Sequence, residues 1–179
     1  MSNILSNLKT SNLLSNLIYQ DTPLYVQYYI TARCNLRCEQ CNIIYANSDV
    51  SECDEIGAET VIRNLAAIGT QVVLLTGGEP FMRTDLPNMV QLANKLGVHP
   101  RIQTNGYASE AALEKVAAAG ANDISISLDS MKPNLQDKIN GGFDETWMRA
   151  IATAQNVSKI FPSTTFAAFG CVLAPSNLN

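Results

Sequence analysis

The sequence is organised around one stretch, Cys34-Asn35-Leu36-Arg37-Cys38-Glu39-Gln40-Cys41. It follows an apolar run from Leu24 to Ile30 that is rich in tyrosine and β-branched residues, which predicts a β-strand. The three thiols are separated by three and then by two residues. One short loop at the end of that strand can therefore direct all of them at a single inorganic centre.

Three cysteines in one loop are compatible with two kinds of metal centre. A [4Fe–4S] cluster has four irons, so three thiolates leave one iron without a protein ligand. An open coordination position is typical of catalytic centres, whereas structural sites are closed. Alternatively, the loop belongs to a zinc site with Cys53 or His99 as the fourth ligand, or the thiols are reduced bystanders. The spacing alone favours the cluster and the zinc site about equally.

Length and composition describe one ordinary globular domain. The chain has 179 residues, of which 46% are hydrophobic and 16% are charged, enough for a substantial core. A net charge of −4 argues against a nucleic-acid-binding protein, which would present a basic surface. The odd number of five cysteines, three of them in one loop, favours a reducing compartment and metal ligation over a disulfide framework.

The N-terminal segment is expected to be a leader helix over residues 1–22, followed by a core domain over residues 23–179. The segment carries leucine and isoleucine at helical spacing, but Ser-Asn pairs interrupt the apolar pattern, so a signal peptide is not expected. No run of about 18 apolar residues is present, which predicts no transmembrane helix. We therefore expect a cytoplasmic protein.

Beyond the cysteine loop, predicted strands and amphipathic helices alternate. The strands are predicted over residues 71–76, 99–104, 123–128 and 164–173, and the helices over 54–68, 85–96, 109–119 and from Asp144 onward. A polar stretch that closes at Gly141-Gly142 separates the fourth strand from the last helix. Such alternation with short links predicts parallel strands joined by right-handed crossovers. The expected fold class is α/β, with a partial (β/α) barrel of the TIM type.

The same alternation predicts where the chemistry lies. In a parallel β/α barrel the loops that follow the strands share one rim, and active sites lie there. The cysteine loop follows the first strand, and the later strands are followed or closed by Gly77-Gly78-Glu79-Pro80, Thr104-Asn105-Gly106 and Ser127-Leu128-Asp129. Four unusual segments are thus expected to converge on one face, which a structural zinc site would not require.

Together these motifs resemble the radical S-adenosylmethionine (radical SAM) superfamily, and the resemblance extends from about Tyr25 to Val172. It implies that Cys34, Cys38 and Cys41 ligate a [4Fe–4S] cluster whose fourth iron is chelated by the methionine group of S-adenosyl-L-methionine. It also implies a flavodoxin- or ferredoxin-like electron donor. Reductive cleavage would give a 5′-deoxyadenosyl radical that takes hydrogen from an unidentified small-molecule or peptide substrate.

The resemblance further implies a set of cofactor-binding residues, and it assigns no catalytic residue. The two glycines would let the backbone approach the ligand because they lack a Cβ, and the glutamate would accept a hydrogen bond from the methionine ammonium. Short polar residues at strand ends would hold the ribose hydroxyls and the methionine carboxylate. A glutamine takes the place of the usual aromatic residue, whose family contact with adenine is largely through the backbone. The set is Gln40, Gly77, Gly78, Glu79, Asn105, Ser127 and Asp129.

Within the superfamily, residues 74–80 and 127–133 look most like the molybdopterin-biosynthesis GTP cyclase and its peptide-modifying relatives. In the cyclase, arginines on the first two strands are expected to grip the triphosphate. The matching positions here are Gln27 and Leu74, so GTP is not the expected substrate. The family barrel has six strand–helix units and five strands are predicted here, so we expect a C-terminally truncated fragment. The alternative is a non-catalytic zinc- or Fe–S-binding protein, or an inactive fragment of an enzyme.

Overall fold

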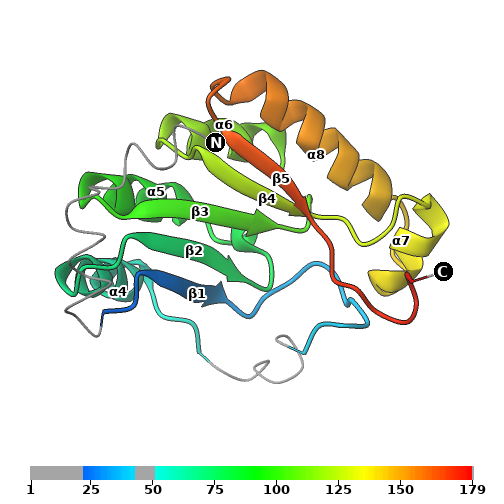
Figure 1. The fold of residues 1–179 in the computed structure, drawn as a ribbon, viewed down its shortest axis with the longest axis horizontal. Coiled ribbons are helices and arrows are strands. Elements are labelled where there is room, and N and C mark those ends of the chain that lie inside the picture. Colours follow the sequence, from blue (N-terminus) through cyan, green and yellow to red (C-terminus); the bar gives the residue numbers. More distant parts are fainter. Residues whose placement is uncertain (1–21, 43–50, 179) are drawn as a thin grey trace.

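The computed structural model describes residues 22–42 and 51–178. The leader helix expected over residues 1–22 lies, except for Thr22, outside this part of the chain. Within it, five parallel strands form one sheet in the order β1-β2-β3-β4-β5 (Figure 1). Strands that neighbour one another in sequence order and are joined through helices are typical of a β/α barrel. The predicted α/β fold with a partial barrel is therefore confirmed.

The strands are β1 (Tyr25–Thr31), β2 (Val72–Gly77), β3 (His99–Thr104), β4 (Asp123–Ser127) and β5 (Phe166–Gly170). The helices are α4 (Glu55–Ala67), α5 (Leu86–Lys95), α6 (Glu110–Ala118), α7 (Pro133–Ile139) and α8 (Thr146–Ile160), with a short 3₁₀ helix η1 (Pro80–Met82). None of these helices is long and apolar enough to cross a membrane.

The ends of the helices follow local signals in the sequence. Ser109 is the N-cap of α6, because its Oγ accepts a hydrogen bond from Ala112 N at 3.2 Å. Gly69 and Gly120 follow α4 and α6 with positive φ angles of 92° and 91°. Both glycines therefore end their helices in the left-handed conformation that favours glycine there.

Helix α7 was not predicted, because its sequence reads as a polar connection. It spans only seven residues, and its buried residues are Gln136 and Ile139, so apolar periodicity is almost absent. The available signal was Pro133, which occupies the first turn, a position that proline favours. This helix proves to carry two of the polar groups of the site.

Helix α8 begins at Thr146, two residues later than expected, because Glu145 adopts a left-handed φ of 65°. The carboxylate of Asp137 on α7 caps the new start: Oδ1 accepts hydrogen bonds from Thr146 Oγ1 at 2.6 Å and from Trp147 N at 3.1 Å. The buried side of the helix runs through Ala150, Thr153 and Val157. Met148 lies on the opposite side and is 61% exposed.

The two faces of the sheet differ in chemistry. Helices α4, α5, α6 and α8 lie next to one another along one face (Figure 1), which carries the apolar core residues Ile30, Val73, Leu75, Ile102, Ile124 and Ile126. Side chains alternate between faces along a strand, so the opposite face carries Tyr29, paired in register with Thr76, and Gln103, paired with Ser125. This polar face is the inner side of the partial barrel, and it leads up to the loops of the rim.

Close approach to α8 constrains the loop after β3. A Cβ at Gly106, which has a φ of +87°, would lie 2.6 Å from Cα of Ala150. Thr153 Oγ1 donates a hydrogen bond to the Gly106 carbonyl at 2.6 Å. Gly97 has a similar φ of +77°, but nothing lies within 4 Å of a Cβ there. A side chain would therefore meet the same left-handed backbone strain at both glycines, but only Gly106 lacks space for a Cβ.

We predict that Gly106→Ala lowers the free energy of unfolding by about 2–4 kcal/mol and Gly97→Ala by about 1–2 kcal/mol. The excess at Gly106 comes from displacing the backbone of α8 as well as from left-handed strain. Urea denaturation of the two variants beside the unaltered chain measures both values. Equal losses would show that contact with α8 does not constrain the loop.

Candidate active site

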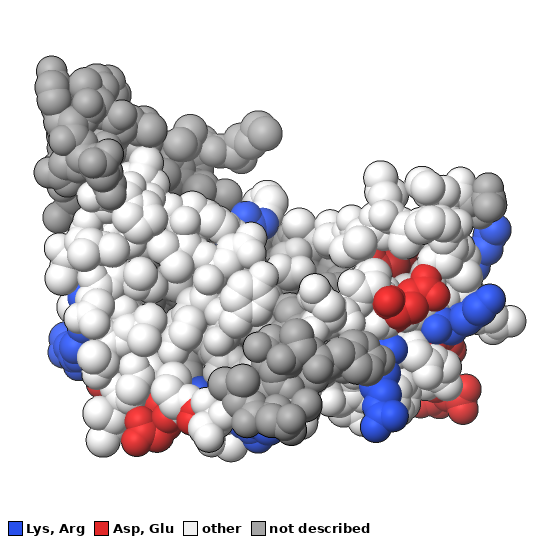
Figure 2. Space-filling view, turned by 90° about the horizontal axis from the view of Figure 1, so that it is seen from below, with Lys and Arg blue, Asp and Glu red and all other residues white. Residues whose placement is uncertain are grey.

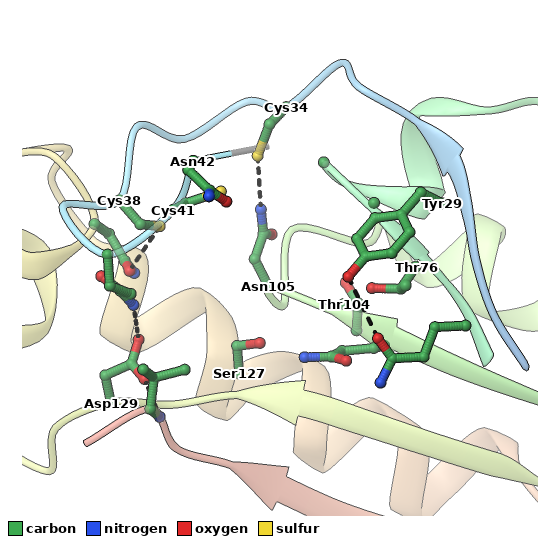
Figure 3. Close-up of a pocket in the computed structure, with 17 residues that line it drawn as sticks. Tyr29, Cys34, Cys38, Cys41, Asn42, Thr76, Thr104, Asn105, Ser127 and Asp129 are labelled. Atoms are coloured by element: carbon green, nitrogen blue, oxygen red, sulfur yellow. Dashed lines mark hydrogen bonds between the residues drawn. The ribbon is translucent and has the colours of Figure 1, made fainter. Parts of the chain in front are cut away.

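The cysteine loop lies over the carboxyl ends of the strands, and Cys34, Cys38 and Cys41 line one pocket of about 370 Å³ (Figure 3). The pocket is also lined by residues at the ends of β2, β3 and β4 or just after them: Thr76, Gly77, Gly78, Thr104, Asn105, Ser127 and Asp129. The four segments expected to converge do converge. Of the predicted site residues, only Glu79 is not among those that line the pocket.

Packing within the protein requires the two glycines after β2. A Cβ at Gly78 would lie 2.1 Å from the carbonyl oxygen of Arg33, and one at Gly77 would lie 2.2 Å from that of Thr31. The space that each missing Cβ leaves is therefore taken by the backbone that leads into Cys34. A side chain at Gly78 would displace the residue that precedes the first cysteine. The expected approach of a ligand to this backbone stays a prediction.

Glu79 lies buried beneath the pocket and is only 1% exposed. Its Oε1 accepts hydrogen bonds from Thr104 Oγ1 at 2.9 Å and Phe81 N at 3.0 Å, and its Oε2 accepts one from Asn105 N at 2.8 Å. These bonds tie the loop after β2 to the loop after β3, and the expected contact of Glu79 with a ligand ammonium stays a prediction. Burial raises the pKa of Glu79 to about 7, although its three hydrogen bonds act to lower it.

Helix α7 holds the cysteine loop from the other side. Its last carbonyls accept backbone hydrogen bonds from the residues on either side of Cys38: Arg37 N bonds to Asn140 O at 3.3 Å, and Glu39 N bonds to Ile139 O at 2.9 Å. The loop is thus anchored at one end by the glycine turn after β2 and in its middle by the end of α7.

Two amide side chains on α7 reach the rim from positions four residues apart, which places them on one face of the helix. Gln136, which is 1% exposed, accepts hydrogen bonds through Oε1 from the backbone N–H groups of Asp129 and Ser130 at 2.8 Å each. Asn140 is 4% exposed, and its Oδ1 lies 3.3 Å from Cys38 Sγ. Sequence reasoning missed both residues because it missed the helix.

The first cysteine has its own hydrogen-bond donors. Leu36 N donates to Cys34 Sγ at 3.4 Å, and Asn105 Nδ2 lies 3.7 Å from the same sulfur and 2.9 Å from Asn35 Oδ1 (Figure 3). The side-chain Oδ1 of Asn105 accepts a hydrogen bond from Tyr107 N at 3.0 Å. This bond orients the NH₂ group of Asn105 toward the sulfur. In this structure the amide of Asn105 supports Cys34, and its expected contact with ribose hydroxyls stays a prediction.

The thiols lie in a setting where ionisation is costly without a compensating cation. Burial, together with the smaller effect of the neighbouring thiols Cys34 and Cys41, raises the pKa of Cys38 to about 12. Burial likewise raises the pKa of Cys34. A bound metal centre compensates thiolate charge directly. The donor set, with its N–H groups directed at sulfur, therefore fits an iron–sulfur cluster.

Gln40 and Asp129 connect the part of the loop that carries Cys41 to the ends of β4 and β5. Gln40 Nε2 donates to Asp129 Oδ2 at 2.9 Å, and Val172 N donates to Asp129 Oδ1 at 2.8 Å (Figure 3). Both oxygens of this carboxylate are thus engaged within the protein. The hydroxyl of Ser127, by contrast, lines the pocket and has no hydrogen-bond partner among the residues that the structure describes.

The geometry does not support the fourth ligands considered for a zinc site. His99 begins β3, at the strand end opposite the rim, with Nε2 3.2 Å from Asp123 Oδ2. Cys53 Sγ lies 3.3 Å from Tyr28 OH and does not line the pocket. Within residues 22–42 and 51–178, no three His, Cys, Asp or Glu side chains are arranged to hold a single metal ion. A cluster differs from such an ion because each thiolate binds a separate iron.

No lysine, arginine or histidine of the described chain lines the pocket. Gln27 and Leu74 pair in register on the inner face, and Leu74 in turn pairs with Arg101. Arg101 is already engaged, because its Nε lies 3.2 Å from Asp123 Oδ1 and its guanidinium stands 5.6 Å from the centre of the Phe166 ring. The inner face therefore offers mainly uncharged polar groups to a ligand.

The sequence matches the family model of the Radical SAM superfamily over residues 28–170. A probable GTP 3′,8-cyclase of Methanococcus maripaludis strain C5 is 30% identical over 149 residues, which are 80% of this chain and 49% of that protein. A PqqA peptide cyclase of Xanthomonas oryzae pv. oryzae is 34% identical over 121 residues, which are 66% of this chain and 32% of that protein. The chain thus spans about half or less of the length of these relatives.

Among solved structures, SuiB of Streptococcus suis bound to its precursor peptide SuiA superposes with a TM-score of 0.72 at 20% identity, over 96% of this chain and 37% of SuiB. SuiB bound to S-adenosylmethionine also superposes with a TM-score of 0.72, at 21% identity, over 92% of this chain and 37% of SuiB. At this identity the likeness concerns the fold.

The buried Glu79 predicts a pH dependence of stability. A carboxyl pKa raised from 4.5 to about 7 means that the native state binds the proton more tightly than the unfolded chain does. The contribution of Glu79 to stability is therefore largest below pH 4.5, falls as the pH rises toward 7 and levels off above it. We predict a loss of about 2 kcal/mol between pH 5 and pH 8, relative to Glu79→Gln.

Urea denaturation of both proteins at pH 5, 6.5 and 8 measures this difference. Glu79→Gln is expected to be less stable at every pH, because the NH₂ group of glutamine would face a protein hydrogen-bond donor instead of an acceptor. Its stability should nevertheless vary less with pH. Equal slopes for the two proteins would contradict the prediction.

Proposed function

This chain belongs to the radical SAM superfamily, and we propose that it acts as an enzyme that binds a [4Fe–4S] cluster and S-adenosyl-L-methionine. The observation that carries the proposal is the meeting of three cysteines with the segments after β2, β3 and β4 at one pocket. When bound, the cluster and S-adenosyl-L-methionine supply a 5′-deoxyadenosyl radical that abstracts hydrogen from an organic substrate. The electron comes from a flavodoxin- or ferredoxin-like donor.

Cys34, Cys38 and Cys41 are the proposed cluster ligands. They come from one loop that is anchored to β2 and α7 by backbone hydrogen bonds, so their spacing is set before any metal binds. Three thiolates on four irons leave one iron open to a further ligand. The pocket lies where that ligand must enter, between the cysteine loop and the strand ends.

The proposed cofactor site has two kinds of residue: those that face the ligand, and those that hold the ligand-facing residues in position. Gly77, Gly78 and Ser127 line the pocket and are the proposed contacts with S-adenosyl-L-methionine through backbone groups and the serine hydroxyl. Glu79 positions the loops after β2 and β3. The Gln40–Asp129 pair holds the loop that carries Cys41 against the end of β4.

The lining of the pocket supports an uncharged polar substrate, such as a peptide, over a triphosphate. Gln27, Tyr29, Thr76 and Gln103 supply hydroxyl and amide groups along the inner face, and these can pair with the amides of a polypeptide. A triphosphate would need cations for its charge, and the described lining has none. A peptide is also the partner of SuiB in the structural neighbour, although the likeness there is in fold.

We predict that serine substitution at Cys34, Cys38 or Cys41 abolishes cluster binding, whereas Cys53→Ser and Cys171→Ser leave it intact. Cys53 and Cys171 are exposed and lie outside the lining of the pocket, so they serve as matched controls. Anaerobic reconstitution should give a brown protein with about four irons per chain, measured by iron analysis and by electron paramagnetic resonance after reduction.

A full cluster in Cys38→Ser would refute the ligand assignment. A colourless protein that takes up zinc alone would refute the proposed function as a whole. The two outcomes are separated by measuring iron, zinc and acid-labile sulfide in the same samples.

We predict that Ser127→Ala weakens binding of S-adenosyl-L-methionine to the reconstituted protein by about 5-fold, the value of one hydrogen bond of about 1 kcal/mol. Ser125→Ala is the matched control, because Ser125 occupies the same face of β4 one position further from the rim. Calorimetry under anaerobic conditions measures both affinities. An unchanged affinity in Ser127→Ala, or an equal loss in both variants, would contradict the assignment.

A further inference from the structure

Side-chain and backbone groups at the C-terminal end of α7 surround the second cysteine, Cys38. Asn140 Oδ1 lies 3.3 Å from Cys38 Sγ (Figure 3), and the backbone bonds of Arg37 and Glu39 to the same helix end flank that cysteine. No other side chain in the described chain lies within hydrogen-bond distance of this sulfur. Asn140 is 4% exposed, so its side chain has little freedom to move away from Cys38.

The contact can persist when the thiol becomes a thiolate only if the amide turns over. A thiol donates its proton to the carbonyl oxygen, but a thiolate has no proton and repels that oxygen. A half-turn of the amide brings Nδ2 to the position of Oδ1 with almost the same shape. In the described structure neither Oδ1 nor Nδ2 of Asn140 has another hydrogen-bond partner, so no existing bond opposes the turn.

Asn105 already has the amide orientation that Asn140 would reach after this half-turn, but at another cysteine. Its side-chain Oδ1 accepts a hydrogen bond from Tyr107 N, and its Nδ2 already points toward Cys34 Sγ. Two thiols of the loop thus each face an asparagine amide, and the two amides come from different elements. Cys41 has no such side-chain neighbour in the part of the chain that the structure describes.

We propose that Asn140 is a positioning residue that donates an N–H···S hydrogen bond to Cys38 when this sulfur ligates the cluster, and that this bond raises the reduction potential of the cluster. The inference rests on the proposed function. One electron passes from an external reductant to the cluster, and no bond to the protein breaks. The reduced cluster is the more negative form, so a donor at a ligand sulfur stabilises it more than the oxidised form.

The test replaces the amide by a carboxylate of the same shape. Asn140→Asp removes the amide donor, and its carboxylate adds negative charge beside the sulfur, so the midpoint potential should fall. Asn134→Asp makes the same chemical change on the same helix at an exposed position and should leave the potential unchanged. Asn140→Ser, whose hydroxyl is too short to reach Cys38, should lower the potential by less than the carboxylate does.

The readout is a redox titration of the reconstituted proteins followed by electron paramagnetic resonance, with iron analysis of each sample. An unchanged potential in a cluster-bearing Asn140→Asp or Asn140→Ser would overturn the proposal. Loss of the cluster from both variants, with Asn134→Asp retaining it, would also overturn it in favour of a purely structural role. A wild-type chain that takes up no cluster would instead refute the proposed function, which keeps the two failures distinct.

Discussion

The turn after β2 is the constraint on which the rest of the site depends. Gly78 N and Glu79 N donate to the carbonyls of Thr31 and Arg33 at 2.8 Å each, which joins the turn to the chain just before Cys34. The buried Glu79 carboxylate then holds the loop after β3 through Thr104 and Asn105. One turn thus aligns three of the four rim segments. Because the carboxylate is almost fully enclosed, its hydrogen bonds must all be made for its burial to be tolerated.

The inner face is the physical basis of the proposal that the substrate is uncharged. The register aligns Gln27, Leu74 and Arg101 across β1, β2 and β3, so one row of side chains forms the floor below the rim. The single cation in that row is neutralised by Asp123 and covered by Phe166. Charge that could bind a phosphate is therefore already satisfied within the protein, and the groups that remain are hydroxyls and amides. Under the proposed function, this row of side chains, rather than the cysteine loop, sets the class of substrate.

The strands and most helices could be predicted from sequence, whereas the supporting groups of the site could not. Apolar runs and cap residues such as Ser109 are local signals, and they located five strands and four of the helices closely. Glu79 sits in a turn whose sequence does not show that its carboxylate is buried, because burial depends on contacts with β3. The roles of Gly78 and Asn105 likewise depend on which backbone or sulfur lies opposite them. Those neighbours are more than 25 residues away in sequence, so no local pattern reports them.

Helix α7 shows why the least regular part of the sequence can carry the most structured part of the site. Gln136 fixes the backbone of Asp129, and Asp129 in turn fixes Gln40. Asn140 and the terminal carbonyls of the same helix fix the loop around Cys38. The seven residues of α7 and its C-cap Asn140 therefore brace both sides of the cysteine loop. To do so the helix must turn amides toward the interior, at positions where a helix that served only stability would carry leucine or isoleucine. The loss of apolar periodicity that hid α7 is thus a consequence of its position against the site, as expected where local sequence rules yield to function.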